Sequence, residues 1–173
     1  MRHLWAPWRM SYIEGTNSED GCLFCTLLDM QDSADTLILI RTHLAFVVLN
    51  RYPYVNGHMM VVPTQHVASL DKLDPDSQSE LMRLTSQSIR VLRQVYGAES
   101  FNLGANIGEP AGAGIADHVH LHILPRWPGD TNFMATTAST RVLPEALEVT
   151  YQRLRQAWES LEDQSSNAPR NQP

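Results

Sequence analysis

Short runs of aliphatic residues, separated by turn-forming residues, occupy the middle of the chain and predict strands. The run over residues 37–49 is split by the polar triplet R-T-H, which predicts two strands joined by a tight turn. The next run, residues 58–62, is stopped by a proline. Further strands are predicted at residues 101–107 and 118–124. The chain therefore contains enough strand segments for one sheet.

Two longer segments carry apolar residues at helical spacing. Residues 75–96 show this spacing, with a proline in the first turn and Gly97 as a stop. Residues 144–161 predict a second long helix, and a short helical turn is expected over 22–29. Because strands and helices do not alternate strictly, we predict an α+β fold with an antiparallel sheet of about five strands.

The length of 173 residues, with 43% hydrophobic and 18% charged residues, is ordinary for one globular domain with its own core. We assign residues 1–162 to this domain. It comprises an N-terminal arm over 1–20, a core over 21–126, and a C-terminal segment and helix over 127–162. The polar tail, residues 163–173, is expected to be disordered.

The charge balance and the start of the chain limit the possible partners. A net charge of −6 makes non-specific binding of nucleic acid unfavourable, whereas small anionic ligands can still bind in a local pocket. The first ten residues carry charges and a proline where a signal peptide needs an apolar core. No apolar run approaches the roughly 20 residues that span a bilayer. We therefore expect a cytoplasmic protein that binds neither nucleic acid nor membranes.

The most informative segment is D-H-V-H-L-H-I-L, residues 117–124. Side chains alternate between the two faces of a strand, so His118, His120 and His122 share one face and the apolar residues between them share the other. Neighbouring histidines lie about 7 Å apart along such a strand. Since the whole chain has only seven histidines, this strict alternation favours a functional site over a sheet surface that is histidine-rich by chance.

A glycine-rich stretch, N-I-G-E-P-A-G-A-G-I over residues 106–115, leads directly into this strand. Glycines allow backbone N–H groups to turn toward an anion and allow phosphates to approach closely. Such a loop alone is often only a turn. Next to the three histidines, it predicts a phosphate-binding loop.

These residues resemble the histidine triad (HIT) family, whose motif is His-φ-His-φ-His-φ-φ with φ apolar. H-V-H-L-H-I-L matches it without a mismatch, and N-R-Y-P-Y-V-N-G-H-M-M-V-V-P extends the resemblance, which covers residues 20–126. The stretches L-W-A-P-W-R and P-R-W-P-G-D-T-N-F-M resemble the branch that contains bacterial diadenosine tetraphosphate phosphorylases. The resemblance implies a HIT-like fold, with a long helix and a C-terminal helix packed on the sheet, and a homodimer.

The resemblance also implies a role for each matching residue. His120 matches the nucleophile, His122 a residue that helps to hold the phosphate, and His118 a residue near the phosphate or the leaving group. The implied substrate-binding residues are Asn50 at the ribose, Asn106, Gly112, Ala113, Gly114 and Ile115 at the phosphates, and Phe46 and Leu49 at the base.

The chemistry of such a site follows from imidazole itself. A neutral imidazole, with an ordinary pKa of about 6.5, is a good nucleophile toward phosphorus at neutral pH. Attack on an α-phosphate yields a nucleotidyl-imidazole, which water or phosphate then cleaves, without an organic cofactor. A hydrogen bond from the other ring nitrogen to a backbone carbonyl would select the reactive tautomer. Gly114 lies where many members have a glutamine, and the missing amide leaves room for inorganic phosphate as the acceptor.

Two cysteines, Cys22 and Cys25, form a C-x-x-C pair, which in a reducing compartment is a metal half-site or a redox pair. The resemblance adds His66 and His118 as the third and fourth ligands of a structural zinc site. The alternative is a pair of buried thiols without metal, with His66 capping a helix. The two roles of His118 compete, because a zinc ligand cannot also be a free acid.

Two other functions are open at this point. Alternating histidines on a strand could hold a catalytic zinc, which would make the protein a metal-dependent hydrolase. The protein could also be a nucleotide-binding sensor with little turnover. A covalent nucleotide on His120, tested with and without a chelator, would separate the first alternative from the nucleophile hypothesis.

Overall fold

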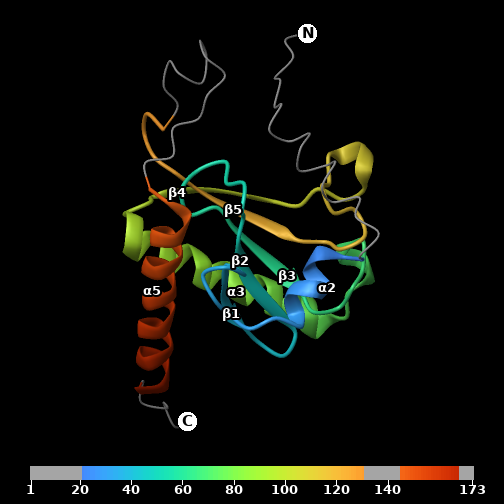
Figure 1. Ribbon diagram of the computed structural model, residues 1–173, viewed down its shortest axis with the longest axis horizontal. Coiled ribbons are helices and arrows are strands. Elements are labelled where there is room, and N and C mark those ends of the chain that lie inside the picture. The colour runs from blue at the N-terminus through green and yellow to red at the C-terminus, as the bar shows by residue number, and fades with distance from the viewer. Residues whose placement is uncertain (1–20, 131–144, 168–173) are drawn as a thin grey trace.

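The computed structural model describes residues 21–130 and 145–167, so the N-terminal arm over 1–20 lies outside the described residues. The described strands form one antiparallel sheet in the order β1-β2-β3-β5-β4 (Figure 1). The predicted α+β class with a five-stranded antiparallel sheet is confirmed. The strand bounds are β1 Ile38–Arg41, β2 Ala45–Leu49, β3 Met59–Pro63, β4 Ser100–Gly104 and β5 Leu121–Arg126.

Two long helices, α3 and α5, pack against the sheet. Helix α3 packs against β2, β3 and β5, and α5 packs against α3 and β1. The short helix α2 lies at the opposite end of the molecule from α5 (Figure 1). The helix bounds are α2 Leu23–Leu28, α3 Pro75–Tyr96 and α5 Leu147–Asn167, with the 3-10 turns η1 Leu70–Lys72 and η2 Glu109–Ala111.

The predicted split of residues 37–49 is confirmed. The turn between β1 and β2 is closed by a hydrogen bond from Thr42 N to Ala45 O at 2.8 Å, and the Thr42 hydroxyl accepts from Ala45 N. Every residue of β2 and of its neighbour β3 is buried. These two central strands therefore have both faces covered and form the rigid centre of the fold.

The long helix begins and ends where the sequence predicts. The Asp74 side chain accepts a hydrogen bond from Ser77 N at 2.8 Å, which satisfies one of the free N–H groups at a helix start. Pro75 occupies the first turn, and Gly97 ends α3 in the left-handed conformation with φ of 60°. Both signals were local, so sequence alone was sufficient to find them.

Three predicted boundaries are corrected by the structure. Strand β4 ends at Gly104 rather than at residue 107. Strand β5 begins at Leu121 rather than 118 and continues through Pro125 to Arg126. Pairing of β5 with β3 stops at Ile123, so only β4 pairs with Pro125. Proline has no backbone N–H, and on the side where β3 would lie no strand acceptor is left without a donor.

The last helix also differs from its predicted ends. Helix α5 runs over Leu147–Asn167 rather than 144–161, which places part of the expected tail in the helix. No glycine or proline occurs between residue 147 and Pro169, so nothing in the chain breaks the helix earlier. Within the described ranges, no helix combines the length and the apolarity needed to cross a membrane.

One glycine permits a close approach between the start of β3 and helix α3. Gly57 has φ of +74°, and a Cβ atom there would lie 2.8 Å from Leu92 Cδ2. Leu92 is fully buried and cannot move away freely. Gly97 has a similar φ of +60°, but its Cβ position is open.

We predict that Gly57→Ala lowers the free energy of unfolding by about 2–3 kcal/mol, and Gly97→Ala by only about 1 kcal/mol. Both substitutions place a Cβ atom on a backbone in the left-handed conformation, but only the Cβ at Gly57→Ala also clashes with Leu92. Urea denaturation of the two variants measures the difference. Equal losses would show that contact with Leu92 does not constrain this turn.

Candidate active site and metal centre

The three alternating histidines lie at the start of β5 and just before it. Val119 N donates to Val67 O at 2.7 Å, which keeps this segment extended and bound to the chain beyond β3. His118 is fully buried and His120 is 5% exposed, and Val119 is buried in the core. His122 lies within β5, opposite Met60 of β3. The rings are therefore held by a buried backbone rather than by a mobile loop.

The His120 ring is oriented by its own backbone. Its Nδ1 lies 2.9 Å from the carbonyl oxygen of His118. A carbonyl only accepts, so Nδ1 carries the proton and Nε2 of the neutral ring has a free lone pair. Burial lowers the pKa of His120 below its ordinary value, against the opposing effect of this hydrogen bond. The ring is thus neutral at physiological pH, and its Nε2 lone pair could attack an electrophile.

A fourth histidine, which is outside the triad motif, determines the tautomer of His122. Tyr54 N donates to His58 Nδ1 at 3.2 Å, so the proton of a neutral His58 is on Nε2. That Nε2 lies 2.9 Å from His122 Nδ1 and donates to it. His122 therefore carries its own proton on Nε2 and can donate it to an anion.

His58 was not among the predicted site residues, although strand register could have indicated it. It directly precedes β3, and Met60, two residues later, lies opposite His122. Residues two apart on a strand share a face, so His58 and His122 are diagonal neighbours. The missing information was which strand lies beside β5.

The His118 ring has both nitrogens engaged. Nε2 lies 2.9 Å from Pro63 O and must donate to it, which leaves a lone pair on Nδ1. Nδ1 lies 3.3 Å from Cys22 Sγ and 3.8 Å from Cys25 Sγ. Burial lowers the pKa of His118, which also favours the neutral ring that a metal requires. Of its two competing roles, this geometry favours the metal ligand.

The cysteines and His66 complete a four-residue cluster with His118. Cys25 Sγ lies 3.3 Å from His66 Nδ1, and the four ligand atoms lie within 4.8 Å of one another. A tetrahedral zinc with ordinary Zn–S and Zn–N bonds would separate its ligand atoms by about 3.3–3.8 Å. Burial and the nearby Cys22 raise the pKa of the Cys25 thiol, so a cation is needed to hold both sulfurs as thiolates. The residues fit zinc.

No second metal cluster occurs in the described part of the chain. Among the described residues, this is the one group of three or more His, Cys, Asp or Glu whose ligand atoms converge. It contains His118 but neither His120 nor His122. This counts against the alternative in which the triad holds a catalytic zinc.

The glycine-rich loop lies at the same end of the sheet as α2, where β5 begins (Figure 1). Asn106 Nδ2 donates to Gly112 O at 3.1 Å and so closes the loop on itself. Gly108 and Gly112 have φ of 83° and 85°, a conformation that favours glycine. Of the other predicted loop residues, Ala113 donates its N–H to Gly108 O, Gly114 is half-buried, and Ile115 packs against the core.

The residues predicted to bind the ribose and the base have mainly structural contacts. Asn50 Oδ1 accepts from Tyr52 N at 2.9 Å, which stabilises the turn after β2. Leu49 lines a cavity of about 170 Å³ together with His58. Phe46 has no exposed surface and packs edge-on against Phe24, 6.3 Å between ring centroids. In this structure Phe46 therefore supports the site from within the core and presents no surface to a ligand.

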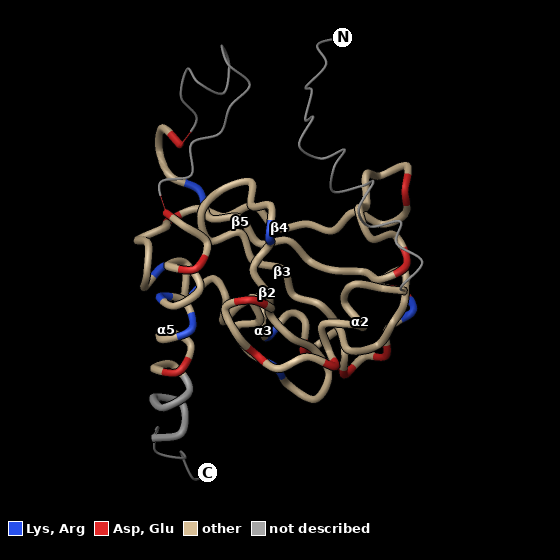
Figure 2. The backbone as a smooth tube through the Cα atoms, in the orientation of Figure 1, with Lys and Arg blue, Asp and Glu red and all other residues tan. Residues whose placement is uncertain are grey.

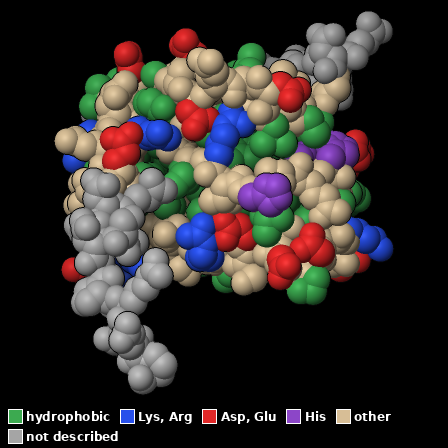
Figure 3. Space-filling model, turned by 90° about the horizontal axis from the view of Figure 1, so that it is seen from below, with side chains coloured by type: hydrophobic (Ala, Val, Ile, Leu, Met, Phe, Trp, Pro, Cys, Tyr) green, Lys and Arg blue, Asp and Glu red, His purple; other side chains and the backbone are tan. Residues whose placement is uncertain are grey.

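Charges of both signs are interspersed over the described chain. Figure 2 shows acidic and basic residues distributed along the whole tube, and the face in Figure 3 shows both kinds in space-filling form. A broad basic surface of the kind that holds nucleic acid is not seen in these views. A phosphate at His120 would depend on local donors such as His122 and backbone N–H groups.

The sequence and the fold are similar to those of known proteins. The HIT domain family matches residues 31–129. The AP-4-A phosphorylase of Mycobacterium tuberculosis is 35% identical over 91% of this chain and 85% of its own length. The asymmetrical bis(5'-nucleosyl)-tetraphosphatase of Schizosaccharomyces pombe is 32% identical over 54% of this chain and 50% of its own. A zinc-bound histidine triad family protein from Mycobacterium smegmatis has the same fold, with a TM-score of 0.66 at 24% identity over 83% of this chain and 97% of its own.

We predict that the ring nitrogens follow the partners described above. Two-bond ¹H–¹⁵N spectra near pH 7.5 should show His120 protonated at Nδ1, and His58 and His122 protonated at Nε2. In His58→Leu, the His122 signals should shift while those of His120 stay. A His120 ring protonated at Nε2 would contradict the nucleophile geometry.

Proposed function

The chain belongs to the HIT domain family, and we propose that it cleaves dinucleoside polyphosphates of the diadenosine tetraphosphate type by transferring a nucleotide to His120. The observation that carries this proposal is the 2.9 Å contact of His120 Nδ1 with the His118 carbonyl, which leaves Nε2 free to attack phosphorus. The match to a phosphorylase of this substrate over 91% of the chain supports the substrate class.

The first step forms a covalent nucleotide. His120 Nε2 attacks the α-phosphorus, the P–N bond forms, and the P–O bond to the leaving nucleoside triphosphate breaks. The proton stays on Nδ1, hydrogen-bonded to the His118 carbonyl oxygen throughout, so the ring bears the positive charge of the nucleotidyl-imidazolium. The Nε2–H group of His122 donates to a phosphoryl oxygen, where negative charge concentrates during transfer.

The second step returns His120 to its starting form. An oxygen of inorganic phosphate attacks the nucleotidyl phosphorus, the P–N bond breaks, and a nucleoside diphosphate leaves. Diadenosine tetraphosphate and phosphate would therefore give ADP and ATP, whereas water as acceptor would give AMP and ATP. Phosphate is supported by Gly114, which offers no side-chain amide near the leaving group, and by the relative named as a phosphorylase.

A structural zinc belongs to the same proposal. Cys22, Cys25, His66 and His118 would hold it, and it would supply a cross-link between α2 and the catalytic segment. No organic cofactor is required by this chemistry. The competing sensor function is disfavoured because the His120 ring is poised for attack.

Two further expectations, a homodimer and a cytoplasmic location, remain predictions. Strand β4 lies at the edge of the sheet, and four of its five residues are exposed. Its Leu103 is 49% exposed, and Ile107 in the next segment is 45% exposed. The unpaired backbone groups of an exposed edge strand favour pairing with a second copy.

We predict that His120→Ala lowers turnover of diadenosine tetraphosphate by about a thousandfold or more, because no other group supplies the lone pair. The melting temperature should change little, and His43→Ala, an exposed histidine outside the site, is the control. Rapid quenching of the wild type in mild base, followed by mass spectrometry, should find the nucleotide on the His120 peptide. ADP as a product only when phosphate is present would identify the acceptor. Full turnover by His120→Ala would refute the proposal.

We predict that the purified protein contains about one zinc per chain, and that Cys22→Ser and His66→Ala lose most of it. Their melting temperatures should fall by about 5 °C or more, because binding of a structural metal contributes to folding. Elemental analysis and thermal denaturation measure both effects, again with His43→Ala as the control. A metal content near zero in protein purified without chelators would argue against the site.

A further inference from the structure

The six-residue helix α2 is held at both ends by distant parts of the chain. Cys22 and Cys25, at its N-terminal end, meet His118 and His66. The N-cap residue Cys22 makes no capping hydrogen bond with its side chain, and α2 has no basic residue of its own in the last turn. A helix this short is not stable alone, so these tertiary contacts determine its position.

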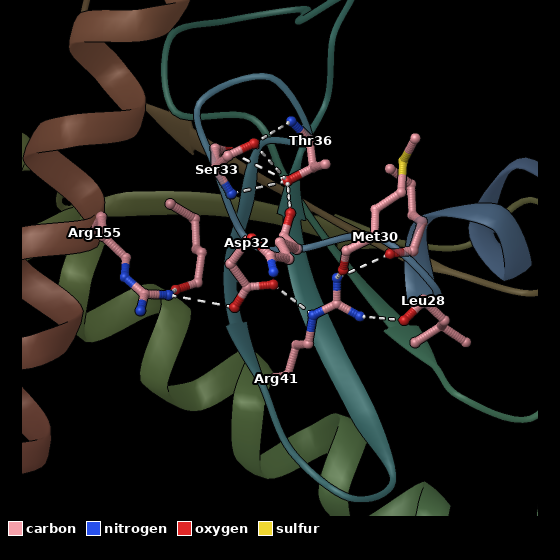
Figure 4. Close-up of polar contacts among 10 residues, drawn as sticks. Leu28, Met30, Asp32, Ser33, Thr36, Arg41 and Arg155 are labelled. Carbon is pink, nitrogen blue, oxygen red and sulfur yellow. Dashed lines mark hydrogen bonds and ion pairs between the residues drawn. The ribbon is translucent and has the colours of Figure 1, made fainter.

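Arg41 of β1 anchors the other end of α2 (Figure 4). Its Nη1 donates to Leu28 O at 2.9 Å, and its Nη2 donates to Leu27 O at 2.8 Å. A guanidinium at this end satisfies free carbonyls and interacts favourably with the helix dipole. Asp32 pairs with Arg41 and in turn with Arg155 of α5, so the anchor is itself held by the fold.

Between these two anchors, α2 presents Phe24 to the histidines. The Phe24 ring lies 5.0 Å from the His120 ring and 5.3 Å from the His118 ring, measured between centroids. Phe24 is 1% exposed and packs on Phe46 behind it. The residue therefore contacts both the nucleophile and a proposed zinc ligand, and it lies between the two cysteines in the sequence.

We propose that Phe24 is a positioning residue for the reaction: its ring confines the His120 imidazole and couples occupancy of the Cys–His metal site to the nucleophile. Rotation of an imidazole about its outer torsion is broad and costs little, so one hydrogen bond to the His118 carbonyl does not confine the ring fully. The packed Phe24 ring removes the alternative positions. This inference rests on the proposed function, because it assigns a cause to the reactivity of His120.

Coupling to the metal follows from the place of Phe24 in α2. When zinc ties Cys22 and Cys25 to His118, the backbone of α2 is held and the Phe24 ring stays against His120. When the four ligands separate, α2 keeps Arg41 and its core packing but loses its connection to His118, so the Phe24 ring can shift relative to His120. The metal thereby affects the nucleophile through packing, without contacting the substrate.

The first test compares Phe24→Leu with Phe101→Leu, the same substitution in β4. Phe24→Leu should lower kcat on diadenosine tetraphosphate by about tenfold to a hundredfold and change KM by less than about twofold, because a buried ring affects attack rather than substrate binding. Phe101→Leu should change neither. Phe24→Met, which fills the space with a flexible chain, should recover part of kcat and serves if Phe24→Leu folds poorly. A kcat for both Phe24 variants within twofold of Phe101→Leu would overturn the proposal.

The second test needs no turnover, so it separates this inference from the proposed function. Ring ¹⁵N signals of His120 are recorded in zinc-loaded wild type, after zinc removal by EDTA, and after zinc is returned. They should shift reversibly in the wild type and by less than half as much in Phe24→Leu. His120 signals in the wild type that do not change when zinc is removed, or equal shifts in both proteins, would overturn the coupling. Turnover retained by His120→Ala would instead refute the proposed function and leave these spectra interpretable.

Discussion

The hydrogen bond between His120 Nδ1 and the carbonyl oxygen of His118 is the contact on which the site depends. It places the proton on the nitrogen that faces the protein and leaves the other nitrogen with its lone pair. The same reasoning separates the neighbouring histidines. His122 receives a proton donor at Nδ1 and becomes a donor at Nε2, whereas His118 donates at Nε2 and leaves Nδ1 to the cysteines. Three chemically identical side chains thus acquire three different tasks from their partners.

These assignments hold only if the backbone carbonyls stay in place, and burial ensures that they do. Strands β2 and β3 are buried along their whole length, and α3 packs across them. Pro63, at the end of β3, supplies the carbonyl that orients His118. Because a packed sheet deforms little, the strand register fixes the positions of the carbonyls that orient the rings.

The metal cluster and the nucleophile share one segment of chain and one helix. His118 belongs to the cluster, its carbonyl orients His120, and Phe24 of α2 touches both rings. A bound zinc would stabilise the fold and restrict this segment by the same contacts. The proposed structural and catalytic roles are therefore not spatially separate, although the proposed metal ligands and the proposed attacking nitrogen are different atoms.

Local patterns were sufficient for much of the fold and for half of the site. The cap at Asp74, the stop at Gly97, the alternation of His118, His120 and His122, and the C-x-x-C pair depend on residues close together in sequence. Imidazole chemistry also predicted a hydrogen bond from the second ring nitrogen of His120 to a backbone carbonyl, and the structure identifies this carbonyl as that of His118.

Only the tertiary structure could decide the partners. His58 reaches His122 because β3 lies beside β5, and Phe24 reaches His120 because distant Arg41 anchors α2. Pro125 fits in β5 because β3 does not extend beside it. Each depends on contacts between segments far apart in the chain. Sequence periodicity states which face of an element a side chain occupies, but not which other element covers that face.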